Sequence, residues 1–330
     1  MNIEEEILVG FLEKCIRLFV VNVAGSVRFR LNLLKEGLFI AENVMQKEED
    51  FKFLNTFFLF LIFYLLIGKY FKKNFFTMHM FLAMKVGVKD VDVFLKSIDL
   101  LEKEGIKING YELQIIKGDS IQEVVKAIEK IRENFNPNFQ GLHPPFPAYA
   151  DNTFSKWERL SSSMNMDYTV MHPSVKKNSI TFLRESVFNC LNKARGRVFV
   201  ENMVTRLNHF GANLIDAAFL SKNVLFDMHH AIFEYENSGR LRINPVEQLK
   251  LVFDSIVAVH CADSIKGEAA VPKNGGTKLF RELMKILFKK KNIFFIAEPK
   301  DGHLNQYIGH METCRQIWKL WEEFKSKELN

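Results

Sequence analysis

From residue 78 onward, short apolar stretches alternate with longer amphipathic stretches along the chain. The short stretches are rich in β-branched and aromatic residues, as buried strands are. Among the longer ones, Ile121–Phe135 places Val124, Ile128 and Ile131 on one helix face, and Lys278–Lys289 has the same period. This alternation predicts eight strands in parallel βαβ units. They are expected at His79–Lys85, Tyr111–Ile116, Asn138–Leu142, Tyr168–Met171, Arg197–Val200, Val224–Phe226, Ile256–Val259 and Asn292–Ala297.

Eight strand–helix units within about 250 residues favour a closed barrel over an open doubly wound sheet. The sequence contains neither a GxGxxG stretch nor a Walker loop, so it lacks the usual signals of a nucleotide-binding fold. We therefore expect an α/β protein in which residues 78–330 form a (β/α)8 TIM barrel. Residues 1–77 are expected to form an N-terminal apolar helical extension.

The extension contains an apolar run, Phe53–Gly68, which is followed by lysines. With the next residues included, a membrane helix over residues 53–71 approaches the ~20 residues that span a bilayer. Acidic residues before the run and lysines after it would then place the barrel in the cytoplasm. Two alternatives stay open: a helix packed on the barrel or on a partner, and non-native upstream sequence, with Met78 or Met80 as the natural start.

Composition and charge narrow the functional classes. The hydrophobic content of 48% supports a sizeable core. The net charge of +6, from 45 basic and 39 acidic residues, is too mild for a dedicated nucleic-acid binder and compatible with a phosphorylated substrate. The four cysteines lack CxxC spacing, so we expect no disulfide framework or thiolate zinc site and a cytoplasmic protein.

Polar residues follow four consecutive apolar strands. Glu201 comes after VFV, Asp227 after VLF, His260 after IVAV and Glu298 after IFFIA. Any one of them could cap a helix or bond a loop, but in a barrel all four converge at one mouth. Three converging carboxylates repel one another unless a cation joins them. Oxygen and nitrogen ligands suit Mn, Mg, Co or Zn, so we expect a divalent metal ion.

In this order the motifs resemble the xylose isomerase-like TIM-barrel superfamily, which holds sugar phosphate isomerases and epimerases together with endonuclease IV. The resemblance covers about residues 78–325. It is carried by Glu112-Leu113 on strand two, His143-Pro144-Pro145 and His172-Pro173 after strands three and four, Glu201 after strand five, Asp227-Met228-His229-His230 after strand six, His260-Cys261-Ala262-Asp263-Ser264 after strand seven, and Glu298 after strand eight.

The resemblance implies a metal-dependent isomerase or epimerase that acts on a sugar or sugar phosphate through an enediolate. Its metal ligands would be Glu201, Asp227, His260 and Glu298, and the catalytic pair Glu201 and Glu298 would move the proton. A second metal or the substrate would be contacted by His143, His172, His230 and Lys266. For His230 a structural role, and for Lys266 a solvated position, are the competing interpretations.

The alternative function is an endonuclease IV-like phosphodiesterase, an AP endonuclease, and only this alternative involves nucleic acid. Its zinc cluster would need His143, His172 and His230. Ala270 stands where the resemblance leads us to expect a further histidine ligand, which puts a three-zinc site in doubt. A barrel that binds a ligand without catalysis is the third possibility. The sequence specifies neither the sugar, nor the metal and its number, nor the oligomeric state.

Overall fold

The computed structural model describes residues 31–33, 39–41, 80–145, 152–175, 180–204, 210–237, 243–300, 302 and 304–328. The chain divides into two compact units, Met1–Thr77 and Met78–Asn330. In the first unit, β1 (Leu31–Leu33) and β2 (Phe39–Ala41) pair antiparallel. The membrane helix expected over residues 53–71 lies outside the described residues. No helix in the described part of the chain is long and apolar enough to cross a membrane.

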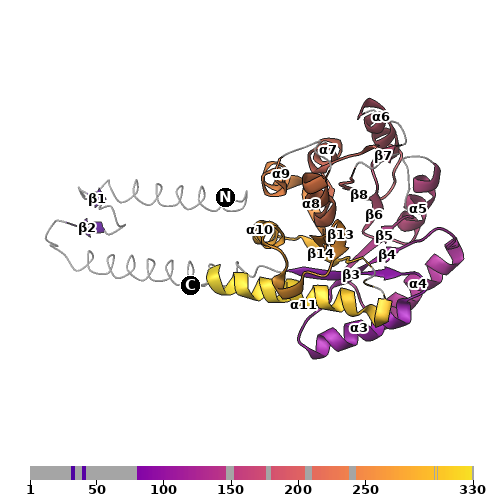
Figure 1. The fold of residues 1–330 in the computed structure, drawn as a ribbon, viewed down its shortest axis with the longest axis horizontal. Helices are drawn as coiled ribbons and strands as arrows, with labels where there is room; N and C mark the ends of the chain where they lie inside the picture. The colour runs from indigo at the N-terminus through magenta and orange to yellow at the C-terminus, as the bar shows by residue number, and fades with distance from the viewer. Residues whose placement is uncertain are drawn as a thin grey trace, which may run out of the picture. The chain divides into compact units, whose positions relative to one another are not determined.

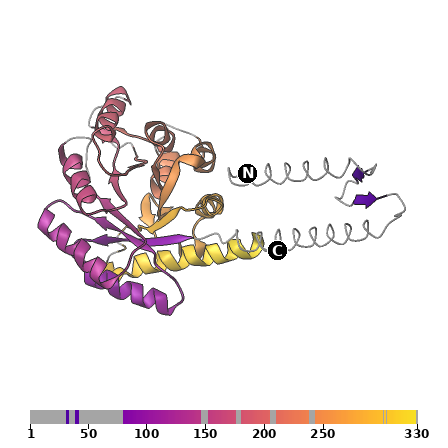
Figure 2. The same cartoon turned by 180° about the vertical axis from the view of Figure 1, so that it is seen from behind.

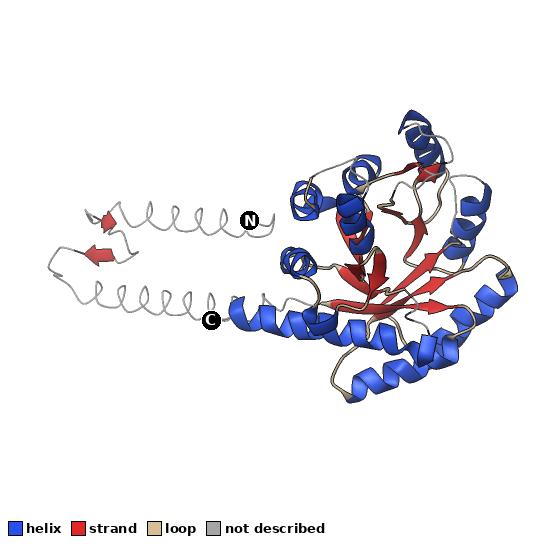
Figure 3. Ribbon diagram, viewed as in Figure 1, coloured by secondary structure: helices blue, strands red, loops and turns tan. Residues whose placement is uncertain are grey.

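Eight parallel strands of the second unit close into a barrel, which confirms the expected TIM-barrel fold. Helices surround the strands, as Figures 1 and 3 show. All strand boundaries agree with the sequence prediction within two residues. The barrel strands are β3 (Phe81–Gly87), β4 (Gly110–Gln114), β5 (Phe139–His143), β6 (Tyr168–Met171), β8 (Val198–Glu201), β10 (Val224–Asp227), β11 (Ile256–Cys261) and β14 (Phe294–Ala297).

The helices follow the strands along the chain. They are α3 (Val91–Lys103), α4 (Ile121–Asn134), α5 (Asn152–Ser163), α6 (Ile180–Leu191), α7 (Leu214–Leu220), α8 (Met228–Asn237), α9 (Pro245–Val252), α10 (Lys278–Leu287) and α11 (Leu304–Glu328). Helix α4 begins with a capping box, in which Ser120 and Glu123 each bond the other's backbone N–H. The long α11 lies along α3 and β3, visible from behind in Figure 2.

Two short antiparallel sheets and two 3-10 turns complete the described elements. One sheet pairs β7 (Ser174–Val175) with β9 (Phe210–Gly211), and the other is a hairpin of β12 (Asp263–Ile265) and β13 (Glu268–Ala270). The turns are η1 (Phe253–Ser255) and η2 (Lys273–Gly275). The strands β7, β9 and β12 follow the carboxyl ends of barrel strands, so both small sheets belong to the end of the barrel where TIM-barrel sites form.

Side chains fill two separate apolar layers. The larger layer lies between strands and helices, and the smaller fills the barrel interior with residues such as Phe139, Tyr168 and Phe199. Because neighbouring residues of a strand face opposite sides, Cys261 belongs to the outer layer while His260 faces inward. Burial raises the pKa of the Cys261 thiol, which fits a core position.

Candidate metal centre

Strand register brings the predicted ligands to one end of the barrel. Asp227 is the last residue of β10 and lies opposite His260 of β11. Glu201 ends β8, and Glu298 follows directly after β14. Glu201, Asp227 and His260 are 2%, 6% and 1% exposed. Charged groups this deeply buried are costly unless partners compensate them, so the cluster needs a chemical explanation.

Three of the predicted ligands surround one atom of the fourth, Nδ1 of His260. It lies 3.3 Å from Oε1 of Glu201, 3.8 Å from Oδ2 of Asp227 and 2.5 Å from Oε2 of Glu298. Bonds of about 2.1 Å place neighbouring ligand atoms of a tetrahedral or octahedral ion roughly 3.0–3.4 Å apart. The spacing of Glu201, Asp227 and His260 is therefore close to that of a coordination sphere.

A second group of ligand atoms lies on the other side of Glu201. The Nε2 atoms of His143 and His172 are 3.2 Å apart, and they lie 3.5 Å and 3.0 Å from Oε2 of Glu201. His143, His172 and Glu201 are therefore spaced so that together they could hold a cation. Within each group, the ligand atoms lie within 4.8 Å of one another. Glu201 thus offers one oxygen to each group, as a carboxylate that bridges two cations does.

His230 is held by the backbone next to Glu201. Its Nδ1 lies 2.9 Å from the carbonyl oxygen of Asn202 and 3.6 Å from the nearest oxygens of Glu201 and Asp227. A ring N–H donated to a carbonyl fixes the tautomer and leaves Nε2 as the acceptor nitrogen. The Asn202 side chain also accepts from the Asp227 N–H and donates to its carbonyl oxygen. His230 therefore combines a structural bond with one ring nitrogen open to other chemistry.

Two charged residues of the site were missed by sequence reasoning. Glu112 of β4 accepts hydrogen bonds from Nε2 of His260 at 2.9 Å and from the Tyr168 hydroxyl at 2.6 Å. Lys85 of β3 lies 3.6 Å from Oε1 of Glu112 and forms an ion pair with Glu298. The sequence places Glu112 in one of the motifs that carry the resemblance but does not indicate a function for it. The signal for Lys85 was a single charge inside an otherwise apolar strand.

Opposite charges in the cluster stabilise one another's ionised forms. Burial would raise the pKa of Glu201, but His260 together with hydrogen bonds from His143 and His172 holds it well below its usual range. Burial would likewise lower the pKa of His260, yet the charges of Glu112 and Glu298 hold it well above its usual range. Burial and His143 lower the pKa of His172, so this ring is neutral and can present a lone pair.

The remaining candidates lie apart from this cluster. Lys266 is exposed in the turn between β12 and β13, and no hydrogen bond or ion pair among the described residues joins it to the cluster. Ala270 pairs with Asp263, whose carboxylate accepts bonds from the Thr277 backbone N–H and hydroxyl. Asp263 is therefore occupied in holding the start of α10.

A cavity of about 160 Å³ opens beside His143, at the carboxyl ends of β4 and β5. A small ligand placed there would be next to His143 and the two prolines that follow it. The residues that line it are Gln114, Ile115, Ile116, Lys117, His143, Pro144 and Pro145.

No family model and no curated protein sequence matches the chain significantly. Among solved structures, AP endonuclease, family 2 from Brucella melitensis has 14% identity and a TM-score of 0.47, with 67% of this chain and 93% of that chain covered. A mandelate racemase/muconate lactonizing family protein from Azoarcus sp. EbN1 has 7% identity and a TM-score of 0.42, with 69% and 53% covered.

A dipeptide epimerase from Methylococcus capsulatus complexed with Mg ion has 9% identity and a TM-score of 0.40, with 68% of this chain and 57% of that chain covered. At these identities the likenesses do not bear on the reaction of this chain. The barrel fold rests on the strand pairing described above, and the chemistry rests on the buried cluster.

Proposed function

We propose that the barrel is a divalent-metal-dependent isomerase or epimerase that acts on a sugar or sugar phosphate. The observation that carries the proposal is the convergence of Glu201, Asp227 and Glu298 within 3.8 Å of Nδ1 of His260. These four residues would hold the cation. When bound, it would supply Lewis-acid stabilisation of the negative charge that develops on two adjacent substrate oxygens.

Glu201 and Glu298 are the proposed proton carriers. Their lowered pKa values keep both carboxylates ionised at neutral pH, so each has a lone pair that can accept a proton. A general base is most effective when its pKa is near the working pH, so this role requires that the substrate weaken their contacts with His260 and Lys85. The Glu298 side chain is 24% exposed and that of Glu201 only 3%, so Glu298 is the more accessible to a substrate proton. The buried ammonium of Lys85, paired with Glu298, would stabilise negative charge on this side of the site.

The histidines and the cavity would bind the rest of the substrate. Nε2 of His230 would contact a substrate hydroxyl, because Nδ1 is engaged by the backbone. The cavity beside His143 would receive the end of the sugar away from the reacting carbons. Lys117 lines the cavity and Lys266 does not, which makes Lys117 the better candidate for a phosphate contact.

A second candidate function is supported by the group His143, His172 and Glu201. Two cations bridged by Glu201 would suit hydrolysis of a phosphodiester, as in an AP endonuclease. The three-zinc arrangement would need a further histidine where Ala270 stands. A duplex substrate would also require a basic groove that grips several phosphates, and the mild net charge gives little support for one.

Metal content and proton exchange distinguish the two functions. We expect elemental analysis of the purified protein to find one divalent cation, and NMR in D₂O to show metal-dependent exchange of an α-proton on a ketose or ketose phosphate. Glu298→Gln should abolish this exchange, whereas Glu268→Gln, at an exposed glutamate paired with Lys300, should leave it unchanged. Three bound zincs with incision of abasic-site DNA at physiological salt would instead establish the nuclease.

A further inference from the structure

We propose that Glu112 is a positioning residue that orients the ring of His260 for cation binding. In this arrangement Nε2–H of His260 is donated to Glu112, and the lone pair of Nδ1 faces the cation. The inference rests on the metal site proposed above. It adds a carboxylate that would act through His260 without touching the cation itself.

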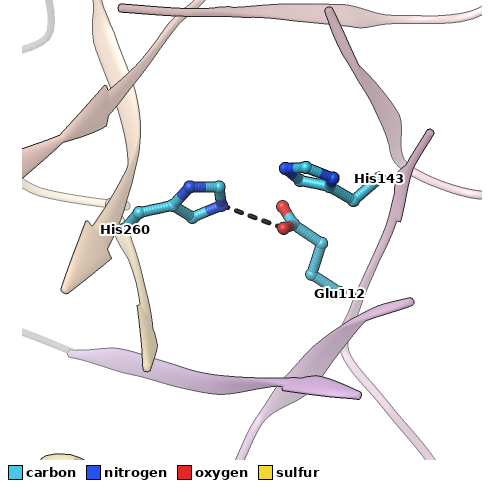
Figure 4. Close-up of side chains that lie close together, drawn as sticks. All are labelled: Glu112, His143 and His260. Atoms are coloured by element: carbon cyan, nitrogen blue, oxygen red, sulfur yellow. Dashed lines mark hydrogen bonds and ion pairs between the residues drawn. The ribbon is translucent and has the colours of Figure 1, made fainter. Parts of the chain in front are cut away.

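The ring of His260 lies between Glu112 on one side and three carboxylates on the other. On one side, Nε2 is 2.9 Å from Oε1 of Glu112, and Figure 4 shows this contact next to His143. On the other side, Nδ1 faces the carboxylates of Glu201, Asp227 and Glu298. A neutral imidazole has one N–H and one lone pair. With a cation at Nδ1 the ring would be neutral, and its one N–H would then lie on Nε2, facing Glu112.

Glu112 is itself held in place. It is fully buried, and its Oε2 accepts a hydrogen bond of 2.6 Å from the Tyr168 hydroxyl. The Tyr168 ring is stacked between those of Phe139 and Phe199, at centroid distances of 4.9 and 4.2 Å. Turning the carboxylate away from His260 would therefore break a buried hydrogen bond to a closely packed partner. A metal-binding histidine commonly donates its other N–H to a carboxylate fixed in this way.

Both oxygens of Glu112 are engaged, which argues against its being a ligand. Oε1 faces His260 and lies 3.6 Å from the Lys85 ammonium, while Oε2 is bonded to Tyr168. Glu112, His143 and His260 do form a group with metal-ligand spacing. The Glu112 oxygens lie on the Nε2 side of His260, away from the Nδ1 side where the other proposed ligand atoms gather. Glu112 is thus better suited to support a ligand than to be one.

The test measures metal binding by the full chain, with Zn²⁺ and Co²⁺ titrated against a chromophoric chelator. Glu112→Ala should weaken binding by about 10–100-fold, the usual effect of removing the partner of a ligating histidine. Glu112→Gln keeps an oxygen that can accept from Nε2–H and should restore part of the affinity. Tyr168→Phe should weaken binding without removing the carboxylate.

The matched control is Tyr111→Phe. Tyr111 is also fully buried in the barrel wall, and its hydroxyl donates a 3.0 Å bond to Gln140, away from Glu112. This variant loses a buried hydroxyl as Tyr168→Phe does, but its metal affinity should match that of the unaltered protein. A loss of affinity in both tyrosine variants would mean that barrel stability controls binding, and it would overturn the proposal.

A second measurement follows the Nε2 proton of the His260 ring directly. In Zn²⁺-loaded protein with ¹⁵N-labelled histidine, the proton on Nε2 of His260 should exchange slowly with water. Exchange should accelerate in Tyr168→Phe and Glu112→Gln, which decide the question if Glu112→Ala does not fold. If metal affinity and proton exchange were unchanged in these variants, the role of Glu112 would be refuted, while the proposed metal site would not be affected. An unaltered protein that binds no divalent cation would refute the proposed function and this inference together.

Discussion

At the residue scale, the site combines buried charges that are stable only as a set. Lys85 is an example, because burial would lower its pKa, while the charges of Glu298, Glu112 and Glu201 outweigh burial and raise it. The ammonium and the carboxylates therefore depend on one another. Removing one member of a buried ion pair leaves an uncompensated charge, which costs more than the pair contributes.

Lys85→Met should lower the free energy of unfolding of the metal-free protein by about 3–5 kcal/mol, because Glu298 and Glu112 lose their cationic partner. Chemical denaturation in the presence of a chelator measures this loss. Lys130→Met is the control, since Lys130 pairs with Asp92 at the surface, where both side chains are exposed. It should cost about 0–1 kcal/mol. Equal effects of the two substitutions would show that the buried cluster is not electrostatically coupled.

The metal-free protein should lose stability as pH rises from about 6.5. The pKa of His260 is raised well above its usual value, so its contribution is complete below about 6.5 and is lost as pH passes the folded-state value. The carboxylates act oppositely, because the pKa of Glu112 is lowered to about 2 and their contribution is lost only in acid. Thermal unfolding with chelator between pH 5 and pH 9 measures the slope.

The same titration with Zn²⁺ present provides the comparison. Cation binding requires Nδ1 of His260 without its proton, so stabilisation by the metal should increase over the range in which the metal-free protein weakens. A metal-free protein whose stability is flat from pH 5 to pH 9 would contradict the raised pKa of His260.

At the scale of elements, close packing between β5 and β6 brings Tyr168 to Glu112. A Cβ at Gly141 would lie 2.0 Å from the Tyr168 ring, a distance that forces one of them to move. Gly141 is thus required by the approach of the neighbouring strand, since its position lets the ring cross β5 toward β4. The sequence pattern predicted both strands but gave no indication of this contact.

Gly141→Ala should lower the free energy of unfolding by about 1–3 kcal/mol, as overpacking of a core does. It should also weaken metal binding, because the displaced Tyr168 hydroxyl no longer holds Glu112. Gly196→Ala is the matched control, with its nearest atoms 3.6 Å from the added Cβ, and it should stay within about 0.5 kcal/mol. Denaturation and chelator competition measure the two effects. Full metal affinity in Gly141→Ala would exclude this packing as a determinant of the site.

At the scale of the whole molecule, the barrel contains every residue assigned to the site. The second compact unit begins at Met78, and its eight strands close without a strand from residues 1–77. The membrane helix, the alternative start site and the cytoplasmic location remain predictions. The closed sheet of the barrel has no open edge that a strand from residues 1–77 would be needed to cover.

A chain that begins at Met78 should therefore be soluble and bind divalent cations with the affinity of the full chain. Size-exclusion chromatography and chelator competition test this expectation. Aggregation of the shortened chain would show that part of residues 1–77 covers an apolar surface of the barrel. A soluble chain with weakened metal binding would show that those residues influence the site.

The sequence by itself determined the barrel and the four-residue cluster. Strand–helix periodicity depends on local burial, and the carboxyl ends of parallel strands always share one end of a barrel. Glu201, Asp227, His260 and Glu298 could thus be placed together because each directly ends a predicted strand or follows one. His143 and His172 were recognised in the same way, although their shared contact with Oε2 of Glu201 was not.

Only the tertiary structure decided what surrounds these residues. Lys85 and Glu112 lie within strands, and alternation alone does not distinguish an inward-facing charge from one that faces the helices. Glu201 offers one oxygen to each of two ligand groups, and His260 has one ring nitrogen facing Glu112 and the other facing the carboxylates of the site. Both arrangements depend on distances between strands that are remote in sequence. Such distances follow from barrel closure and side-chain packing, which the order of residues along the chain does not specify.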